Sequence, residues 1–206
     1  MNFNIAATKS NLIKTKKTLS LSREGYELLD EKRRILLQEL TTVIDSVDRN
    51  QQQVDDALSR AYKAVDRATV RAGGDRIHSL SISVDIKSRL AITSRRVMGV
   101  SVPVINVDIQ DKPPYYSLHE VDLSVDDAVR EFKELLSLLA VLAEKKITLL
   151  RLAQEARKTI RKVNALEKVY IPYYSDTFKY IGDRLDEESR DSFSMLKLIK
   201  KEKTRQ

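Results

Sequence analysis

The sequence contains no cysteine and no tryptophan, and it has few residues that interrupt regular structure, with 5 glycines and 4 prolines among 206 residues. Without cysteine the chain cannot form a disulfide, use a thiolate nucleophile or bind a metal through sulfur. No apolar run reaches the ~18 to 20 residues that a membrane-spanning helix requires, and the first residues lack the apolar core of a secretion signal. We therefore expect a helix-rich protein on the cytoplasmic side of a membrane.

Signatures of catalysis and ligand binding are missing as well. The glycine pair in Ala72–Asp75 lacks the spacing and the Lys-Ser/Thr of a phosphate-binding loop. The two histidines, His78 and His119, are far apart and show no metal-ligand spacing. Acidic residues fall in patterns such as LDEESRD, which are typical of a solvated helix face with ion pairs. The sequence thus predicts a chain that has no catalytic residues, metal ligands or cofactor site of its own.

A heptad pattern occupies the first third of the chain. Apolar or small side chains recur at alternating steps of three and four residues, which places one side chain per turn along one stripe of an α-helix. The a and d positions are Leu12, Thr15, Leu19, Ser22, Tyr26, Leu29, Arg33, Leu36, Leu40, Val43, Val47, Asn50, Val54, Ala57, Ala61, Ala64 and Ala68. The pattern predicts a coiled-coil seam about 90 Å long. Its polar members, above all Arg33 and Asn50, either fix the helix register or mark places where the seam opens.

A second helical run, residues 124–200, carries a matching stripe. Its apolar or small positions are Leu149, Ala153, Ala156, Ile160, Val163, Leu166, Tyr170, Tyr173, Phe178, Ile181 and Leu185. Ser124 is the expected N-cap, and Pro172 is expected to kink the helix near Ile171 without ending it. Because so narrow a stripe needs a partner helix of similar length, we expect the two runs to fold back on each other antiparallel, as a rod.

The segment between the helical runs is rich in β-branched residues. Two strands, at residues 89–93 and 97–107, are predicted to be joined by a turn at Ser94–Arg96. Pro103 lacks a backbone donor and so requires an edge strand, and Gly99 inside the second strand suggests a bulge or a close backbone approach. A two-stranded hairpin is marginally stable alone, so it is expected to dock on the helices or on another protein.

The predicted fold is therefore mainly α, a long antiparallel two-helix coiled coil with a small β-hairpin in the middle of the chain. An N-terminal coiled-coil helix is expected at residues 1–72 and a middle region at 73–120, with the hairpin at about 88–107. A C-terminal coiled-coil helix, kinked near Pro172, is expected at 121–206.

The net charge of +7 is unevenly distributed. Both ends of the chain are basic, whereas residues 111–134 are mostly acidic. Basic ends could contact nucleic acid, a membrane surface or an acidic protein cavity, or they could simply be solvated. Nucleic-acid binding is the weaker interpretation, because no aromatic platform or known reader motif accompanies the basic residues.

Three motifs carry a resemblance to a known family. They are RRVMGVSVP at residues 95–103, RKVNALEKVYIP at 161–172 and YIGDRLDEESRDSFSMLKLIKK at 180–201. Together with the layout of the N-terminal helix, they resemble the D subunit of the V-type and archaeal-type rotary ATPases over nearly the whole chain. The resemblance implies a non-catalytic central rotor shaft that transmits torque between the catalytic hexamer and the ion-translocating membrane rotor, peripheral to the membrane. The implied partners are a hexamer of alternating catalytic and nucleotide-binding subunits, the small F subunit and a funnel-like subunit on the rotor ring.

Two groups of residues are candidates for contacts with such partners. The first is mainly basic and comprises Lys14, Lys16, Lys17, Arg157, Lys158, Arg161, Lys162 and Asn164. The second lies at the hairpin and comprises Arg95, Arg96, Met98 and Gly99. Two alternatives stay open: the basic residues form a solvated face, and Met98 with Val100 packs the hairpin onto its own helices. A non-motor coiled-coil scaffold or tether is the alternative function.

Overall fold

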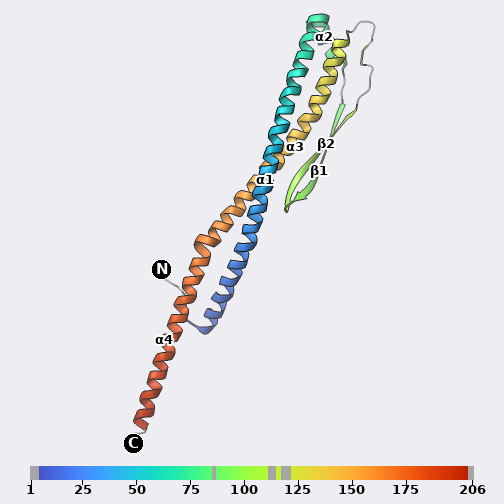
Figure 1. The fold of residues 1–206 in the computed structure, drawn as a ribbon. Coiled ribbons are helices and arrows are strands. Elements are labelled where there is room, and N and C mark those ends of the chain that lie inside the picture. Colours follow the sequence, from blue (N-terminus) through green and yellow to red (C-terminus); the bar gives the residue numbers. More distant parts are fainter. Residues whose placement is uncertain (1–4, 85–86, 111–114, 117–121, 204–206) are drawn as a thin grey trace. The chain divides into compact units, whose positions relative to one another are not determined.

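Seven elements make up the fold in the computed structural model, which describes residues 5–84, 87–110, 115–116 and 122–203, with side chains up to residue 200. The helices α1 (Lys9–Ala72) and α2 (Gly74–Ser83) come first. The strands β1 (Lys87–Val97) and β2 (Val100–Gln110) follow. Helix α3 (Leu123–Ala165) continues through a π-helical turn, η2 (Leu166–Tyr170), into α4 (Ile171–Lys203). The expected mainly-α fold with two long helical runs and a central hairpin is confirmed (Figure 1).

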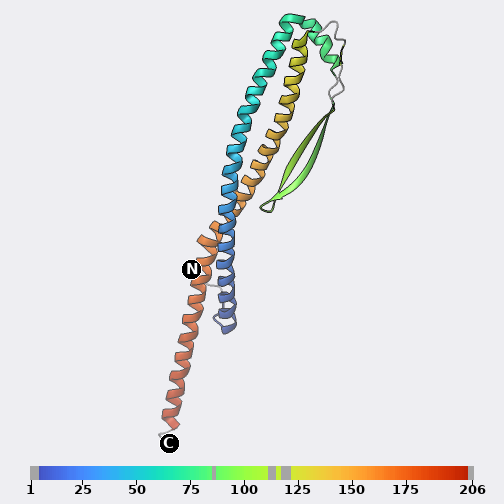
Figure 2. The same ribbon diagram turned by 45° about the vertical axis from the view of Figure 1, so that its right-hand side comes forward.

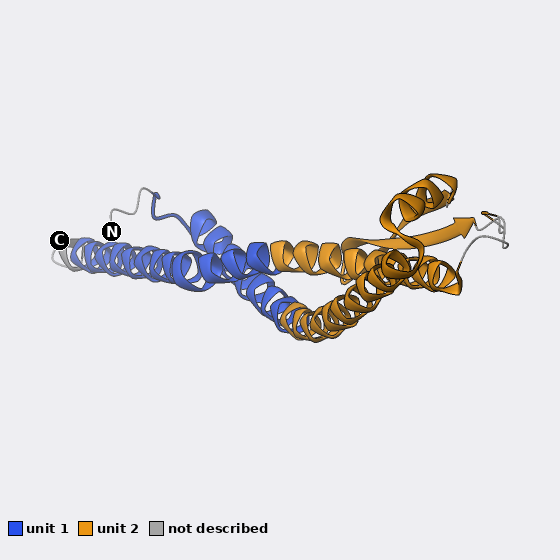
Figure 3. Ribbon diagram, turned by 90° about the horizontal axis from the view of Figure 1, so that it is seen from above, with its two compact units in different colours: residues 1–35, 156–206 blue, residues 36–155 orange. Residues whose placement is uncertain are grey.

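The chain divides into two compact units, shown in different colours in Figure 3. Unit 1 comprises residues 1–35 and 156–206, and unit 2 comprises residues 36–155. Each unit therefore contains one part of α1 and one part of the C-terminal helical run.

In unit 2, α1 and α3 run antiparallel. Residues further along α1 contact residues that come earlier in the C-terminal run. Gln51 contacts Lys146 at 2.7 Å, Arg60 contacts Glu131 at 3.2 Å, and Arg71 contacts Asp122, just before α3, at 3.5 Å. Figures 1 and 2 show the two helices side by side over this stretch. The expected antiparallel pairing is confirmed for this unit.

The interface between these helices is the predicted heptad seam. Its core cluster consists of Val47, Val54, Ala57, Ala61, Leu135 and Leu142. From Val54 to Ala68 every a and d position on α1 is at most 4% exposed. Alanine dominates this stretch, and its small side chain lets neighbouring helices approach closely. None of the a and d positions assigned from the sequence is solvent-exposed, in either unit, so the assignment is confirmed.

Three of the four polar seam positions, Ser22, Arg33 and Asn50, bond within their own helix. The Asn50 side-chain amide donates to the Ser46 carbonyl at 2.8 Å, and the Ser22 hydroxyl donates to the Thr18 carbonyl at 2.8 Å. Arg33 pairs with the buried carboxylate of Asp30, three residues earlier. Within the described residues these contacts are local, and they fix no register between helices.

In unit 1, the start of α1 lies beside α4 in both ribbon views (Figures 1 and 2). Leu19 on α1 and Val163 and Ile181 on the C-terminal run are buried. The stripe predicted for this run is partly wrong. Ala153 is exposed and its neighbour Leu152 is fully buried, while the Tyr170 side chain is 49% exposed.

The π-helical turn explains why the stripe moves. Up to Leu166 the half-buried and buried positions follow heptad steps, and they resume at Ile171 after a step of five residues. A π turn accommodates one extra residue in an α-helix. Pro172 follows this turn after Ile171, and in an α-helix its ring would clash with the carbonyl of Lys168. The helix continues through Pro172, as expected, and the change in helix type lies on its N-terminal side.

Two details of the middle region differ from the sequence prediction. Helix α2 was not expected; it begins after Gly73, which has a positive φ of 85°, and presents Ile77 and Leu80 on one face. Ser124 is not the N-cap, because α3 begins at Leu123 and the Val125 amide already donates to the Asp122 carbonyl at 2.9 Å. Ser124 instead lies buried within the first turn.

The seam makes a prediction about stability that two adjacent leucines can test. Leu135 is 4% exposed within the core cluster, whereas Leu136 is 38% exposed. Leu135→Ala is expected to lower the free energy of unfolding by about 2–5 kcal/mol, because it leaves a cavity in the seam. Leu136→Ala serves as the control and should cost less than about 1 kcal/mol. Urea unfolding measures both, and equal losses would contradict the assignment of the seam.

Candidate functional site: partner-binding surfaces

The basic candidates lie on helix surfaces in two separate groups. All eight side chains of that set are exposed. Lys14, Lys16 and Lys17 belong to the start of α1, beside α4, whereas Arg157–Asn164 belongs to the last turns of α3 (Figures 1 and 2). Among the described residues, none of these cations has an acidic partner within 4 Å. The structure therefore provides two unpaired positive surfaces in unit 1, available to an acidic partner.

The hairpin candidates surround a turn that lies later in the chain than predicted. Ser94–Arg96 is part of β1, and the turn consists of Met98 and Gly99, with φ angles of 50° and 79°. Positive φ at both central residues defines a type I′ turn, whose twist matches that of the flanking strands. The predicted turn position and the bulge at Gly99 are therefore wrong. Gly99 adopts this conformation without cost, but Met98 is held in a region that disfavours a side chain.

The hairpin docks on α3 through β2. The Ile105 amide donates to the Glu144 carboxylate at 2.8 Å, and the Arg151 guanidinium donates to the Ser101 carbonyl at 2.8 Å. Between these anchors, Val102 is fully buried and Pro103 is buried. Of the two expected docking places, the helices or another protein, the structure shows contacts with helix α3. Pro103 lies in an edge strand of the two-stranded sheet, as expected.

Met98 is 47% exposed, and Val100, on the other side of the turn, is half-buried. Arg95, Arg96 and Gly99 are also exposed, so the hairpin candidates as a group face away from the packed core. Sequence reasoning missed Glu144 and Arg151, which anchor the hairpin from α3. Nothing in their local sequence distinguishes them from other charged residues of a solvated helix face.

The end of α4 carries an apolar surface that sequence reasoning also missed. Every residue from Asp186 to Lys200 is exposed, and in both ribbon views this part of the helix extends past the start of α1 (Figures 1 and 2). Its large apolar side chains are between 58% and 69% exposed; they are Phe193, Met195, Leu196, Leu198 and Ile199. Contiguous exposed apolar side chains mark an interaction site. The signal was the SFSMLKLI sequence, whose five large apolar residues are interrupted by Ser194 and Lys197.

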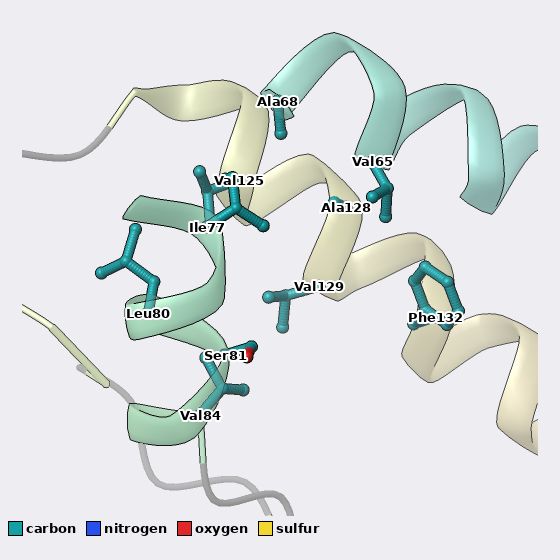
Figure 4. A pocket seen from close by; sticks show the side chains of 10 residues that line it. All are labelled: Val65, Ala68, Ile77, Leu80, Ser81, Val84, Val125, Ala128, Val129 and Phe132. Carbon is teal, nitrogen blue, oxygen red and sulfur yellow. The ribbon is translucent and has the colours of Figure 1, made fainter. Parts of the chain in front are cut away.

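Helix α2 leaves an apolar pocket of about 250 Å³ between itself, α1 and α3 (Figure 4). Side chains from all three helices point into it, with Val65 from α1, Leu80 from α2 and Phe132 from α3 among them. Ser81 supplies the only hydroxyl of the lining, and no charged residue contributes to it. The pocket therefore offers no acid, base or metal ligand for catalysis.

Tyr115 and Tyr116, which precede α3 in the chain, both contact side chains of that helix. The Tyr116 hydroxyl donates to the Asp126 carboxylate, and the Lys133 ammonium lies 5.1 Å from the centre of the Tyr115 ring. Burial, followed by the hydrogen bond and the negative charge of Asp126, raises the pKa of the Tyr116 hydroxyl well above its usual range. The hydroxyl thus remains a donor throughout the physiological pH range.

Groups of side chains suited to metal binding are absent from the part of the chain that the structure describes. His78 is exposed on α2, and His119 lies outside the described residues. No helix in the described ranges is both long and apolar enough to cross a bilayer.

Comparison with known proteins identifies the family. The family described as the D subunit of ATP synthase matches residues 11–201. The chain belongs to the ATP synthase D-subunit family. The D subunit of the A-type ATP synthase of Thermococcus kodakarensis is 35% identical over 96% of this chain and 94% of its own length. The corresponding protein of Pyrococcus furiosus is 35% identical over 95% and 93%. The D subunit of the V-type ATP synthase of Thermotoga neapolitana is 32% identical over 98% and 99%.

The motifs that carry the resemblance coincide with the local features described above. Residues 95–103 span the hairpin turn and the buried part of β2. Residues 161–172 contain the π turn that precedes Pro172. Residues 180–201 include the exposed apolar end of α4.

The turn at Met98 makes a testable prediction about the hairpin. Met98→Asn is expected to stabilise the hairpin by about 0.5–1 kcal/mol, because asparagine tolerates a left-handed conformation better than methionine does. Slower hydrogen exchange at the amides of Ala91, Thr93 and Arg95 measures the gain. Met98→Leu, which keeps an apolar side chain, is the control and should bring no gain. Faster exchange in Met98→Asn than in the control would contradict the type I′ assignment.

Proposed function

We propose that this D subunit is the central rotor shaft of its ATP synthase. It transmits torque between ATP hydrolysis or synthesis in a catalytic hexamer and ion translocation by the membrane rotor. It carries out no bond chemistry itself. The proposed partners are the hexamer of alternating catalytic and nucleotide-binding subunits, the small F subunit and the funnel-like subunit on the rotor ring.

The observation that carries this proposal is the seam between α1 and α3. A shaft transmits torque only if it resists twisting, and an isolated helix twists easily. Two helices that interlock at every turn resist it, because twisting one against the other would displace close-packed side chains. The run of buried alanines from Ala57 to Ala68 supplies such an interlock, with each side chain at most 1% exposed. The cross-helix pairs of Arg60 with Glu131 and Glu134 reinforce one flank.

The end of α4 suits insertion into a ring of other subunits. Its exposed apolar side chains would be covered by the inner surface of such a ring, which removes apolar area from water. Each side chain buried in this way contributes roughly 1.5–3 kcal/mol. The apolar side chains cover a wide arc of the helix, interrupted by Ser194 and Lys197, so the helix contacts the ring over more than one face.

The basic surfaces of unit 1 serve, in this proposal, as an electrostatic bearing against acidic groups of the ring. Exposed ion pairs contribute only about 0–1 kcal/mol each, so a shaft held by them can release and re-engage at every step. The exposure of Arg161 and Lys162, without acidic partners in the described part of the chain, supports this role. In this proposal, the exposed side of the hairpin and the surface of α2 contact the other stalk subunits, which are the small F subunit and the funnel-like subunit.

The end of α4 provides the test of the proposal. The ring subunits are co-expressed with the full chain, without it, or with a Phe193→Ala/Leu196→Ala/Ile199→Ala variant, and sustained ATP hydrolysis is measured. Alanine keeps the helix intact but removes most of the apolar surface. The variant is expected to bind the ring at least ~10-fold more weakly and to lose hydrolysis in proportion.

The matched control is Glu188→Ala/Arg190→Ala, which changes exposed polar residues of the same helix end. It should bind and support hydrolysis like the unmodified chain. Equal hydrolysis with and without the chain would refute the shaft, and it would favour a scaffold. A stoichiometry other than one chain per hexamer would refute it as well.

A further inference from the structure

The two outer edges of the hairpin differ. In an antiparallel pair joined by a two-residue turn, the residues that flank the turn exchange hydrogen bonds, and the following pairs alternate between bonded and non-bonded. Val97 and Val100 flank the turn, so the pairs of Arg95 with Val102 and Thr93 with Val104 are bonded. In each strand, the residues between bonded pairs point their backbone groups outward.

The outer edge of β2 is already occupied. Its outward-facing positions include Ser101, Pro103 and Ile105. The Ser101 carbonyl accepts a hydrogen bond from Arg151, the Ile105 amide donates to Glu144, and Pro103 has no N–H to offer. This edge therefore has no room for another strand.

The outer edge of β1 is open. Its outward-facing residues are Ser88, Leu90, Ile92, Ser94 and Arg96. Every residue of β1 from Lys87 to Arg96 is exposed, and no described side chain or backbone group bonds to these outward amides. An open row of backbone donors and acceptors is the template on which another extended segment can pair.

The side chains of β1 specify what such a segment must contain. Leu90 and Ile92, 59% and 68% exposed, share one face with Val107 and Ile105, which lie directly opposite on β2. This face is apolar at its centre, and Arg96 lies on it near the turn. The other face carries Arg89 and Arg95, and the strand contains no acidic residue. An incoming strand would thus need apolar side chains on the first face and acidic side chains on the second.

We propose that β1 receives an extended segment of another polypeptide, in which acidic and apolar residues alternate, as a third strand. The proposal rests on the proposed function in one respect: the segment belongs to another subunit of the assembled ATP synthase. The added strand completes a three-stranded sheet, which is more stable than a two-stranded one. The hairpin, which is fixed to α3 by its other edge, is then the binding site for that subunit.

Charged residues on an edge strand also occur as protection against unwanted pairing. In β1 the cations lie toward the two ends, and the central residues 90–94 are uncharged. The edge is thus open where pairing would begin. If the charges only prevent unwanted pairing, the outward amides of β1 stay unbonded in the assembled complex. If a strand is added, these amides become hydrogen-bonded there.

Hydrogen exchange resolved to single amides tests the proposal, with the full-length chain alone and in the purified ATP synthase complex. Strand addition predicts that the amides of Leu90, Ile92 and Ser94 exchange at least ~10-fold more slowly in the complex. The amides of Thr93 and Arg95 already bond to β2 and are the internal reference. Unchanged exchange at the outward amides of an intact complex would overturn the proposal and leave the shaft function untouched.

A matched pair of variants at Ser94 provides the second arm. Ser94→Pro removes one outward donor without removing a donor of the ladder, and Pro103 occupies the equivalent position opposite. Ser94→Ala keeps the donor. We expect Ser94→Pro to retain the complex about five- to tenfold less well than Ser94→Ala, at equal helix content and thermal stability of the isolated chain. Equal retention of both variants would contradict strand addition.

Discussion

Close packing of alanines between α1 and α3 is the interaction on which the structure of unit 2 depends. The helices are charged over most of their surface, and their apolar stripes are narrow, so neither forms a core alone. The buried stretch from Val54 to Ala68 brings the two backbones close together, and the leucines Leu135 and Leu142 of α3 extend the contact. Because the alanine side chains are short, the two backbones lie close together and one helix has little room to rotate against the other. The pair therefore resists twisting. This resistance is the mechanical property that a shaft requires.

Each unit also has a surface that its own packing does not cover. The hairpin is attached to α3 by two polar contacts from Glu144 and Arg151 and by the buried Val102. It therefore has a fixed edge and an open edge. In unit 1, α4 has its own open surface, the apolar side chains beyond Asp191. In the proposed function, the seam provides stiffness and these exposed surfaces contact other subunits.

Much of this arrangement could be predicted from the sequence, because heptad periodicity reports directly on which side of a helix is buried. Every a and d position of α1 is buried or half-buried, including the polar Thr15 and Asn50. The family could also be recognised, because its motifs are local in sequence. Burial is predicted most reliably where one periodic pattern continues over many helical turns, because every turn gives independent support for the same buried face.

The errors arose where local chemistry competes with tertiary packing. Met98 occupies a left-handed position that sequence preference assigns to asparagine or glycine, so the turn was placed at Ser94–Arg96 instead. Helix α2 escaped prediction because its β-branched residues favour strands, and only packing near α1 and α3 explains it. The shift of the C-terminal stripe required knowledge of the π turn before Pro172, and periodicity alone cannot locate an inserted residue.

The partner surfaces were the least predictable part. A basic side chain on a helix has the same local sequence whether it is solvated or in contact with another protein. The open edge of β1 follows only from the register of the strands and from the contacts of α3, neither of which the sequence encodes locally.

The most direct test of the shaft is to fix the chain to the ring during turnover. A photo-crosslinking amino acid in place of Phe193 is introduced into the assembled ATP synthase, and ATP hydrolysis is measured before and after irradiation. A rotating shaft predicts full activity before irradiation and loss of sustained hydrolysis in proportion to the crosslinked fraction. Undiminished hydrolysis by complexes in which the chain is covalently joined to the ring would contradict the account.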